Sequence, residues 1–262
     1  MAKFYPMFSS SKGNSTYIGT AEGGVVVDVG ASAKRICEAL SSAGITPDKI
    51  DAVLITHEHS DHIKGLKTFL KKTGATLIAS RLTVSALKCM GVLGDDTNII
   101  YADEQSEIII RDMTIKRFAT SHDCEGSSGY TVSFGNIKTA VCTDTGILTD
   151  EIRQNLEGCR LVMLESNHDP VMLRLGPYTP ELKVRIGSEK GHLANADCAA
   201  EIKRLYNLGT THFVLAHLSE NNNTPEKASS ATRAALMDLG AKINEDYILY
   251  VAPEEGGKVI SL

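Results

Sequence analysis

A run of histidines and acidic residues in the first quarter of the chain constrains the fold more than any other feature. It directly follows residues 52–56, which have the apolar composition of a buried strand, and precedes residues 63–72, whose apolar spacing predicts a helix. Four of its side chains form a His-x-His-x-Asp-His pattern: His57, His59, Asp61 and His62. Histidines two positions apart in extended backbone point to the same side and can share one metal ion. The aspartate and the last histidine, at the turn into the helix, can reach a second ion, so one segment predicts ligands for two metals.

Three further polar residues follow apolar runs later in the chain. His122, Asp144 and His217 each stand at the end of an expected strand. Polar residues at strand ends are where α/β proteins build their sites, so we expect these three to complete the ligand set. Five histidines and two aspartates are nitrogen and oxygen ligands that suit zinc and are compatible with manganese or iron. The sequence therefore predicts two bound divalent metal ions.

Strands and helices alternate along the chain after a strand-rich opening, which is typical of an α/β fold. We expect strands at residues 3–8, 15–20, 24–30, 52–56, 107–118, 130–142, 161–164, 213–216 and 247–251. We expect helices at residues 32–43, 63–72, 83–90, 150–156, 196–206 and 225–239. The irregular residues 171–191 are expected to form a surface loop or lid, either simply solvated or facing a substrate. With 262 residues and no linker-like stretch, residues 1–262 are expected to form a single domain.

Charge and composition exclude several classes of protein. The 27 basic and 32 acidic residues give a formal net charge of −5, which excludes binding of nucleic acid through bulk positive charge. No apolar stretch approaches the roughly 18 residues of a membrane span, and the first residues lack the pattern of a signal peptide. We therefore expect a cytoplasmic protein that makes no membrane contact. The six cysteines include no CxxC pair and are expected to be mostly small buried residues, with Cys142 of interest because it lies near Asp144.

The spacing of the seven candidate ligands resembles that of the metallo-β-lactamase superfamily over essentially the whole chain. The resemblance implies an α/β protein with a four-layer αβ/βα sandwich, whose dinuclear site lies between two sheets. It also implies a division of the ligands between two ions. The first ion would be held by His57, His59 and His122, the second by Asp61, His62 and His217, and Asp144 would bridge them.

Four motifs narrow the resemblance to the small bacterial YycJ/WalJ (VicX-like) family. They are residues 9–15 (SSSKGNS), 164–169 (LESNHD), 191–193 (GHL) and 217–223 (HLSENNN). That family implies a metal-dependent phosphodiesterase, a DNA exonuclease that works from the 5′ end, with DNA a more probable substrate than RNA and an oligomeric state left open. The chain has Ala194-Asn195 where the family usually has a serine after Gly-His-Leu. This difference leaves hydroxyl contacts at that point in doubt.

The same motifs suggest which residues contact the substrate. Ser11 and Asn14 lie in a turn where Gly13 and small side chains let backbone N–H groups approach an anion, although an ordinary hairpin loop is the alternative. His168, Ser219 and Asn222 are further candidates for substrate binding. Whether His168 is functional or structural is left open by the sequence. Basic residues that could contact phosphates are Lys12, Arg174, Lys183, Arg185 and Lys190.

The expected reaction is attack by a hydroxide held between two metals about 3.5–4 Å apart, with Asp61 serving both as ligand and as the group that orients the hydroxide. His192 precedes a helix and lies 25 residues before His217, which in the phosphodiesterase branch places it beside the scissile phosphate. We expect it to act as the general acid, with Glu165 raising its pKa; a passive hydrogen bond is the alternative. Two other functions stay open: hydrolysis of another ester, thioester or cyclic nucleotide, or a non-hydrolytic regulatory role that keeps the metals.

Overall fold

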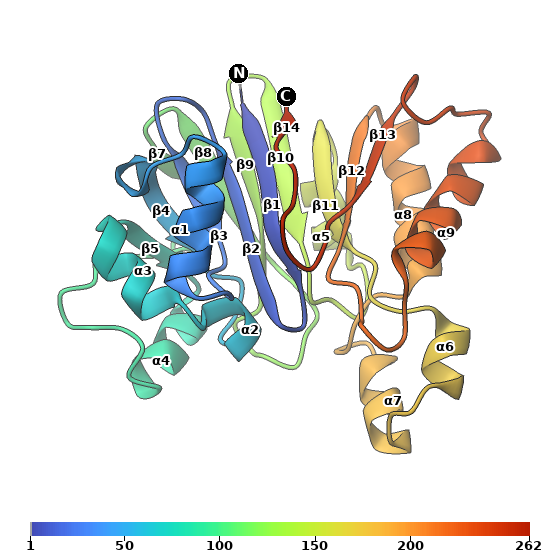
Figure 1. The fold of residues 1–262 in the computed structure, drawn as a ribbon, viewed down its shortest axis with the longest axis horizontal. Coiled ribbons are helices and arrows are strands. Elements are labelled where there is room, and N and C mark those ends of the chain that lie inside the picture. The colour runs from blue at the N-terminus through green and yellow to red at the C-terminus, as the bar shows by residue number, and fades with distance from the viewer. Residues whose placement is uncertain (1) are drawn as a thin grey trace. The chain divides into compact units, whose positions relative to one another are not determined.

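The computed structural model describes residues 2–262, which form two compact units (Figure 1). The first unit contains the chain up to Arg117 together with Cys124–Ile137 and Pro253–Leu262. The second unit contains Phe118–Asp123 and Lys138–Ala252. The expectation of a single domain stays a prediction. None of the helices within residues 2–262 is long and apolar enough to cross a membrane.

The first unit is built on a mixed sheet with the strand order β14-β1-β2-β3-β4-β5-β6. Its strands are β1 (Lys3–Ser10), β2 (Gly13–Gly19), β3 (Gly24–Val27), β4 (Ile50–Leu54), β5 (Thr76–Ala79), β6 (Ile99–Tyr101) and β14 (Ile260–Ser261). Strands β14, β1, β2 and β3 pair antiparallel, whereas β3, β4, β5 and β6 pair in parallel. The carboxyl ends of β3 and β4 therefore meet at one edge of the sheet, which is where the histidine run begins.

Helices of the first unit cover one face of this sheet. They are α1 (Ala33–Ser42), the 3-10 helix η1 (Pro47–Lys49), α2 (Ser60–Ile63), α3 (Leu66–Thr73) and α4 (Arg81–Cys89). Ile36 of α1, Phe69 of α3 and Leu87 of α4 are fully buried against alternate sheet residues such as Val53 and Leu77. The unit also contains strands β7 (Ile108–Ile110), β9 (Ser128–Phe134) and most of β8 (Met113–Ala119).

The second unit has a parallel arrangement of strands covered by helices. The strands pair in the order β10 (Ile137–Cys142), β11 (Leu161–Glu165), β12 (His212–Ala216) and β13 (Ile248–Val251). The helices are α5 (Asp150–Leu156), α6 (Pro170–Leu175), α7 (Pro180–Ile186), α8 (Asn195–Asn207) and α9 (Pro225–Met237). Helices α8 and α9 lie side by side next to β12 and β13 (Figure 1). Ile202, Leu205 and Leu236 on these helices are fully buried with Leu164 and Leu215 of the strands.

The structure corrects the expectation of an irregular loop over residues 171–191. This segment contains the two short helices α6 and α7. The side chains of Asp169 and Thr179 cap them by accepting hydrogen bonds from the backbone N–H groups of Met172 and Leu182. A proline follows each cap at the first helical position, where its missing N–H costs no hydrogen bond. The segment therefore consists of two short helices and their connections rather than one irregular loop.

Two predicted strands each divide into a hairpin. Residues 107–118 form β7 and β8, which pair antiparallel around Arg111 in the left-handed conformation. Residues 130–142 cover most of β9 and β10, which are separated by Gly135 at a φ of 56°. The helix expected at 63–72 is also interrupted, since α2 ends at Ile63 and α3 begins at Leu66.

Candidate metal centre

The predicted ligand run of the first unit folds as two pairs of facing side chains. Nε2 of His57 lies 3.0 Å from Nδ1 of His59, as expected for two histidines that share an ion. Nε2 of His62 lies 3.4 Å from Oδ2 of Asp61. His57 and His62 are fully buried. We call these four residues the first-unit cluster.

Asp28, which the sequence analysis did not select, orients this cluster from behind. It directly follows β3 and adopts a φ of 60°, an uncommon conformation for a residue with a side chain. Its Oδ2 accepts a hydrogen bond of 2.8 Å from Nδ1 of His62. Thr56 Oγ1 lies 2.9 Å from the same oxygen and 3.0 Å from Nδ1 of His57. Both Nδ1 atoms are thus engaged, which leaves Nε2 of each ring to face a metal, the arrangement of a carboxylate–histidine–metal relay.

Burial and hydrogen-bonding neighbours shift the pKa of Asp28 in opposite directions. Burial raises the pKa of this carboxyl, while the His62 ring and the Thr56 N–H and hydroxyl donors lower it. The net pKa lies above the ordinary value. A signal for this residue is visible in hindsight, because it ends the apolar run Val25–Val27 just as His57 follows the next strand.

Asn14, a predicted substrate contact, lies against the first-unit cluster. Its Nδ2 is 3.1 Å from Nε2 of His62 and 3.3 Å from Oδ2 of Asp61. Gly30 makes this approach possible, because a Cβ atom there would overlap the carbonyl oxygen of Asp61 and the backbone nitrogen of Asn14. Ser11, by contrast, is exposed at the tip of the β1–β2 hairpin. Of the two turn residues, only Asn14 reaches the ligands.

The second unit brings its candidate residues to the carboxyl ends of three parallel strands. Cys142 of β10 is in register with Leu164 of β11, and Glu165 of β11 with Ala216 of β12. Asp144 and His217 therefore emerge at the same sheet edge as Glu165, as the rule for α/β sites predicts. Asp144 and His217 also have φ values of 56° and 54°. Such strained backbone concentrates at functional sites.

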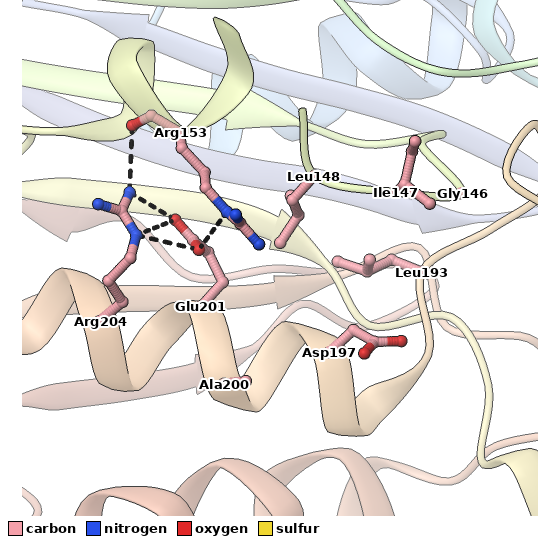
Figure 2. A pocket seen from close by; sticks show the side chains of 9 residues that line it. All are labelled: Gly146, Ile147, Leu148, Arg153, Leu193, Asp197, Ala200, Glu201 and Arg204. Atoms are coloured by element: carbon pink, nitrogen blue, oxygen red, sulfur yellow. Dashed lines mark hydrogen bonds and ion pairs between the residues drawn. The ribbon is translucent and has the colours of Figure 1, made fainter. Parts of the chain in front are cut away.

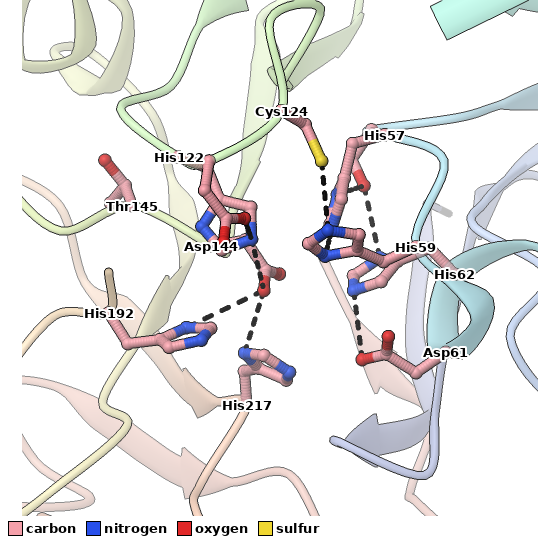
Figure 3. A network of polar contacts seen from close by, with 12 residues as sticks. His57, His59, Asp61, His62, His122, Cys124, Asp144, Thr145, His192 and His217 are labelled. Carbon is pink, nitrogen blue, oxygen red and sulfur yellow. Dashed lines mark hydrogen bonds and ion pairs between the residues drawn. The ribbon is translucent and has the colours of Figure 1, made fainter. Parts of the chain in front are cut away.

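Glu165 contacts two histidines of the second-unit cluster, which we define as His122, Asp144, Glu165, His192 and His217. Figure 3 shows Asp144 facing the three histidines of this cluster. Its Oε1 accepts hydrogen bonds from Nδ1 of His192 at 2.8 Å and from Nδ1 of His217 at 2.9 Å. Its Oε2 accepts the backbone N–H of Thr145 at 2.8 Å. Nδ1 of His217 is also 3.3 Å from Oδ1 of Asp144.

Burial and neighbouring charges shift the pKa values of Glu165, His192 and His122 in the second-unit cluster. Burial raises the pKa of Glu165, but the two histidines that donate to it outweigh burial and hold its pKa well below the usual range. Burial lowers the pKa of His192, but attraction to Glu165 and Asp144 outweighs this and raises it. Burial lowers the pKa of His122, which keeps its ring neutral, as a metal ligand must be.

The Gly191-His192 segment positions two histidines at once. Nδ1 of His122 lies 3.1 Å from the carbonyl oxygen of Gly191, which fixes its donor nitrogen. The N–H of His192 donates to the carbonyl oxygen of Ile186 at the end of α7. A Cβ atom on Gly191 would overlap that oxygen and the carbonyl oxygen of Arg185. Only glycine allows this close packing.

The other predicted substrate contacts of the second unit are buried in the loops that support the cluster. Ser219 Oγ accepts hydrogen bonds from the backbone and side-chain nitrogens of Asn222. The carbonyl oxygen of Asn222 accepts the N–H of Asp169. His168 is buried, and burial lowers its pKa. Asn195 belongs to the Ala194-Asn195 pair that follows Gly-His-Leu. Its side-chain oxygen accepts a 2.7 Å hydrogen bond from the Ser166 hydroxyl.

Several of the predicted basic contacts already have partners. Lys12 pairs with Glu254, Arg185 with Asp123, and the Lys183 ammonium donates to the carbonyl oxygen of Arg174.

The cysteines are buried with the exception of Cys89. Cys142 is fully buried and burial raises its pKa, so it is not a reactive thiol. Cys124, not selected from the sequence, contacts His59.

A separate cavity of about 470 Å³ lies in the second unit between the β10–α5 connection and α8 (Figure 2). Its arginines, Arg153 and Arg204, both pair with the buried carboxylate of Glu201. None of the predicted site residues lines this cavity. Its arginines are paired with a carboxylate and no histidine lines it, which distinguishes it from the two histidine clusters.

Comparisons with known proteins place the chain among hydrolases. The Beta-lactamase superfamily domain matches residues 25–218. The exodeoxyribonuclease YycJ of Bacillus anthracis is 33% identical over 248 residues, which cover 94% of each chain. The exodeoxyribonuclease WalJ of Streptococcus pneumoniae is 35% identical over 246 residues, covering 92% of this chain and 91% of WalJ. The chain belongs to the YycJ/WalJ family.

A solved structure confirms the fold class of this family member. Zn²⁺-bound PqqB from Methylobacterium extorquens superposes with a TM-score of 0.73 over the whole of both chains, at 17% identity. The predicted metallo-β-lactamase fold, a four-layer αβ/βα sandwich by class, is thus confirmed. The prediction of an enzyme, a metal-dependent hydrolase, is confirmed by family membership. The chemistry of both clusters, buried imidazole nitrogens and carboxylate oxygens with oriented rings, suits divalent metals.

Proposed function

We propose that this YycJ/WalJ family member is a DNA exonuclease that acts from the 5′ end and depends on two divalent metal ions. The observation that carries this proposal is the similarity to YycJ, which extends over 94% of both chains. The candidate ligands support it, because each unit presents a cluster of them with buried histidines that carboxylates orient from behind.

The ligands divide as the family resemblance implies. His57, His59 and His122 would hold the first ion, Asp61, His62 and His217 the second, and Asp144 would be shared by the two. Zinc and manganese are the favoured ions, and iron is compatible with the same donors. Asp28 and Glu165 orient His62 and His217 from behind, so they tune metal affinity without binding the ions themselves.

When bound, the ions would supply Lewis acidity and lower the pKa of a water, so that hydroxide could serve as the nucleophile. Asp61 would accept a hydrogen bond from this hydroxide and so orient it. His192 donates a proton to the departing sugar oxygen, and Glu165 keeps its Nδ1 engaged so that Nε2 faces the substrate. Asn14 contacts Oδ2 of Asp61 and Nε2 of His62, the ring nitrogen opposite the one that Asp28 engages, and so helps to position both residues.

The phosphodiester backbone would be held by residues around the clusters. Ser11 is exposed at its turn, and Arg174 and Lys190 are exposed basic side chains of the second unit. The remaining predicted substrate contacts are buried in the loops that support the second-unit cluster, so they would help to shape the substrate site from within: His168, Ser219 and Asn222. Binding through a few cationic groups predicts that the rate falls as salt rises.

A time course on DNA and RNA strands labelled at the 5′ or the 3′ end, with manganese or zinc added, tests this function. The proposal predicts that 5′-labelled DNA releases mononucleotides or short products from the first time points, while 3′-labelled DNA shortens gradually. RNA is cleaved more slowly. Rapid thioester or β-lactam turnover without DNA cleavage would contradict the proposal, and early release from the 3′ label would reverse its polarity.

A further inference from the structure

Cys124 lies beside two of the candidate metal ligands (Figure 3). Its Sγ is 3.1 Å from Nε2 of His59, whose Nδ1 is 3.0 Å from Nε2 of His57. One ligand atom from each of the three residues lies within 4.8 Å of the others. All three belong to the first unit, and Cys124 is only 8% exposed. The sulfur therefore lies within reach of an ion bound by the two histidines, next to the His59 nitrogen that points away from His57.

The loop that carries Cys124 is fixed by its own hydrogen bonds. The carbonyl oxygen of Gly126 accepts three side-chain hydroxyl groups, those of Ser80 at 3.0 Å, Thr83 at 3.3 Å and Ser128 at 2.8 Å. A Cβ atom on Gly126 would overlap the Ser80 and Thr83 hydroxyls, so glycine is required for this contact with the start of α4. A second anchor comes from Arg117, which donates to the Ser128 hydroxyl at 2.7 Å. The thiol is thus placed by a rigid loop, as metal ligands require.

We propose that Cys124 is a further ligand of the metal ion that His57 and His59 bind. Zinc bonds of about 2.3 Å to sulfur and 2.0–2.1 Å to nitrogen place tetrahedral ligand atoms roughly 3.3–3.6 Å apart. The two short contacts use opposite nitrogens of His59, so its ring has to turn until one nitrogen faces both His57 and Cys124. One ligand atom from each residue already lies within 4.8 Å of the others, so the change needed is a rotation of one side chain. On binding, the thiol proton is released to solvent and the thiolate sulfur forms the bond to the ion, so the ion gains one sulfur ligand and one negative charge.

A thiolate changes which metal the site prefers. Soft sulfur ligands select zinc, and cobalt as its spectroscopic substitute, over manganese, which prefers oxygen. The inference rests on the proposed function in that His57 and His59 are ligands in both. The inference adds that this ion is zinc rather than manganese. It also adds a sulfur ligand from Cys124, two positions after His122.

Cobalt(II) added to the metal-free full-length protein tests the inference directly. We expect a near-ultraviolet thiolate-to-cobalt charge-transfer band in the wild type, loss of this band in Cys124→Ser and Cys124→Ala, and an unchanged band in Cys89→Ser. Cys89 is an exposed cysteine at the end of α4 and is the matched control. Loss of a residue that only hydrogen-bonds a metal ligand lowers metal affinity by roughly 10–100-fold. Zinc affinity should fall by more than this in both Cys124 variants, while manganese affinity changes little.

The outcomes separate this inference from the proposed function. A wild type that binds divalent ions and cleaves DNA but shows no charge-transfer band overturns the role of Cys124 alone. A band that persists unchanged in both Cys124 variants assigns it to another cysteine and also overturns the inference. A wild type that binds neither cobalt nor zinc contradicts both proposals. Circular dichroism of each variant confirms that it is folded before its metal affinity is compared.

Discussion

Nδ1 of His192 lies 2.8 Å from Oε1 of Glu165, a carboxylate that is fully buried, while the His192 side chain stays 20% exposed. A carboxylate only accepts hydrogen bonds, so His192 must donate from Nδ1. Its Nε2 is then the nitrogen that faces outward. This pairing raises the pKa of His192 and gives it the form that a proton donor needs.

Replacement of His192 by alanine tests its proposed role as a general acid. We expect the rate on DNA to fall by about 10²–10⁴-fold, because the sugar oxygen is a poor leaving group without a proton donor. On a phosphodiester with a nitrophenyl leaving group the loss should be small, since that group departs without protonation. Rates on the two substrates provide the measurement, with metal content checked in parallel.

His212→Ala is the matched control for this experiment. His212 begins β12, and its ring contacts the hydroxyl of Thr211 rather than any member of the two clusters. It should keep wild-type rates on both substrates. Equal losses on both substrates in His192→Ala would assign His192 to substrate binding, and loss of metal would make it a ligand.

Asp28→Asn tests the support behind His62. The substitution keeps the size of the side chain but removes the carboxylate that accepts from Nδ1 of His62 and from Thr56. Loss of such a partner weakens metal binding by about 10–100-fold, which zinc titration of the metal-free protein measures. Asp51→Asn is the control, because Asp51 pairs with the exposed Arg111. Equal zinc affinity in both variants would show that Asp28 does not act through its histidine.

Gly191→Ala should disturb two histidines through one methyl group. The added Cβ would overlap the carbonyl oxygens of Arg185 and Ile186, which displaces the N–H of His192 and the acceptor of His122. We expect a loss of about 1–3 kcal/mol in the free energy of unfolding and a clear loss of activity. Gly187→Ala, four residues earlier, is the contrast: its Cβ would meet nothing closer than 3.5 Å, and stability should change by less than about 0.5 kcal/mol. Urea unfolding of the two variants gives the comparison, and similar losses would rule out the steric explanation.

The cap of α6 predicts a pH-dependent contribution to stability. The hydrogen bond from the Met172 N–H, together with Lys227, holds the pKa of Asp169 below its ordinary value. A lowered pKa in the folded state stabilises the protein above the unfolded pKa, and this contribution disappears as the pH falls through the folded value. Asp169→Ala should therefore cost about 1 kcal/mol at pH 7 and less below about pH 4.

Unfolding at pH 7 and at pH 3 measures this effect. Ser32→Ala removes the N-terminal cap of α1, whose first turn has no acidic residue, so its cost should be the same at both pH values. A pH-independent cost of Asp169→Ala would show that the cap acts through hydrogen bonding without a contribution from charge.

Local sequence signals predicted the strands that end just before the candidate ligands. An apolar run followed by a histidine or aspartate identifies a strand end, because the buried strand and the polar edge both lie within a few neighbouring residues. The register of β10, β11 and β12 then brings Asp144, Glu165 and His217 together without further information.

Supporting residues from distant parts of the chain could not be predicted in this way. Asp28 reaches His62 across 34 positions, and Cys124 reaches His59 across 65, so only the folded backbone connects them. Helices α6 and α7 were missed for a different reason. They are too short to show a clear apolar period, although Asp169-Pro170 and Thr179-Pro180 are recognisable starts.

Metal content of the purified protein tests the central claim most directly. Elemental analysis after reconstitution with zinc should give two ions per chain, because seven nitrogen and oxygen ligands are too many for one tetrahedral site. His217→Ala should lower this number and abolish cleavage of 5′-labelled DNA. A wild type that saturates at one ion, with the same content in His217→Ala, would contradict the dinuclear site.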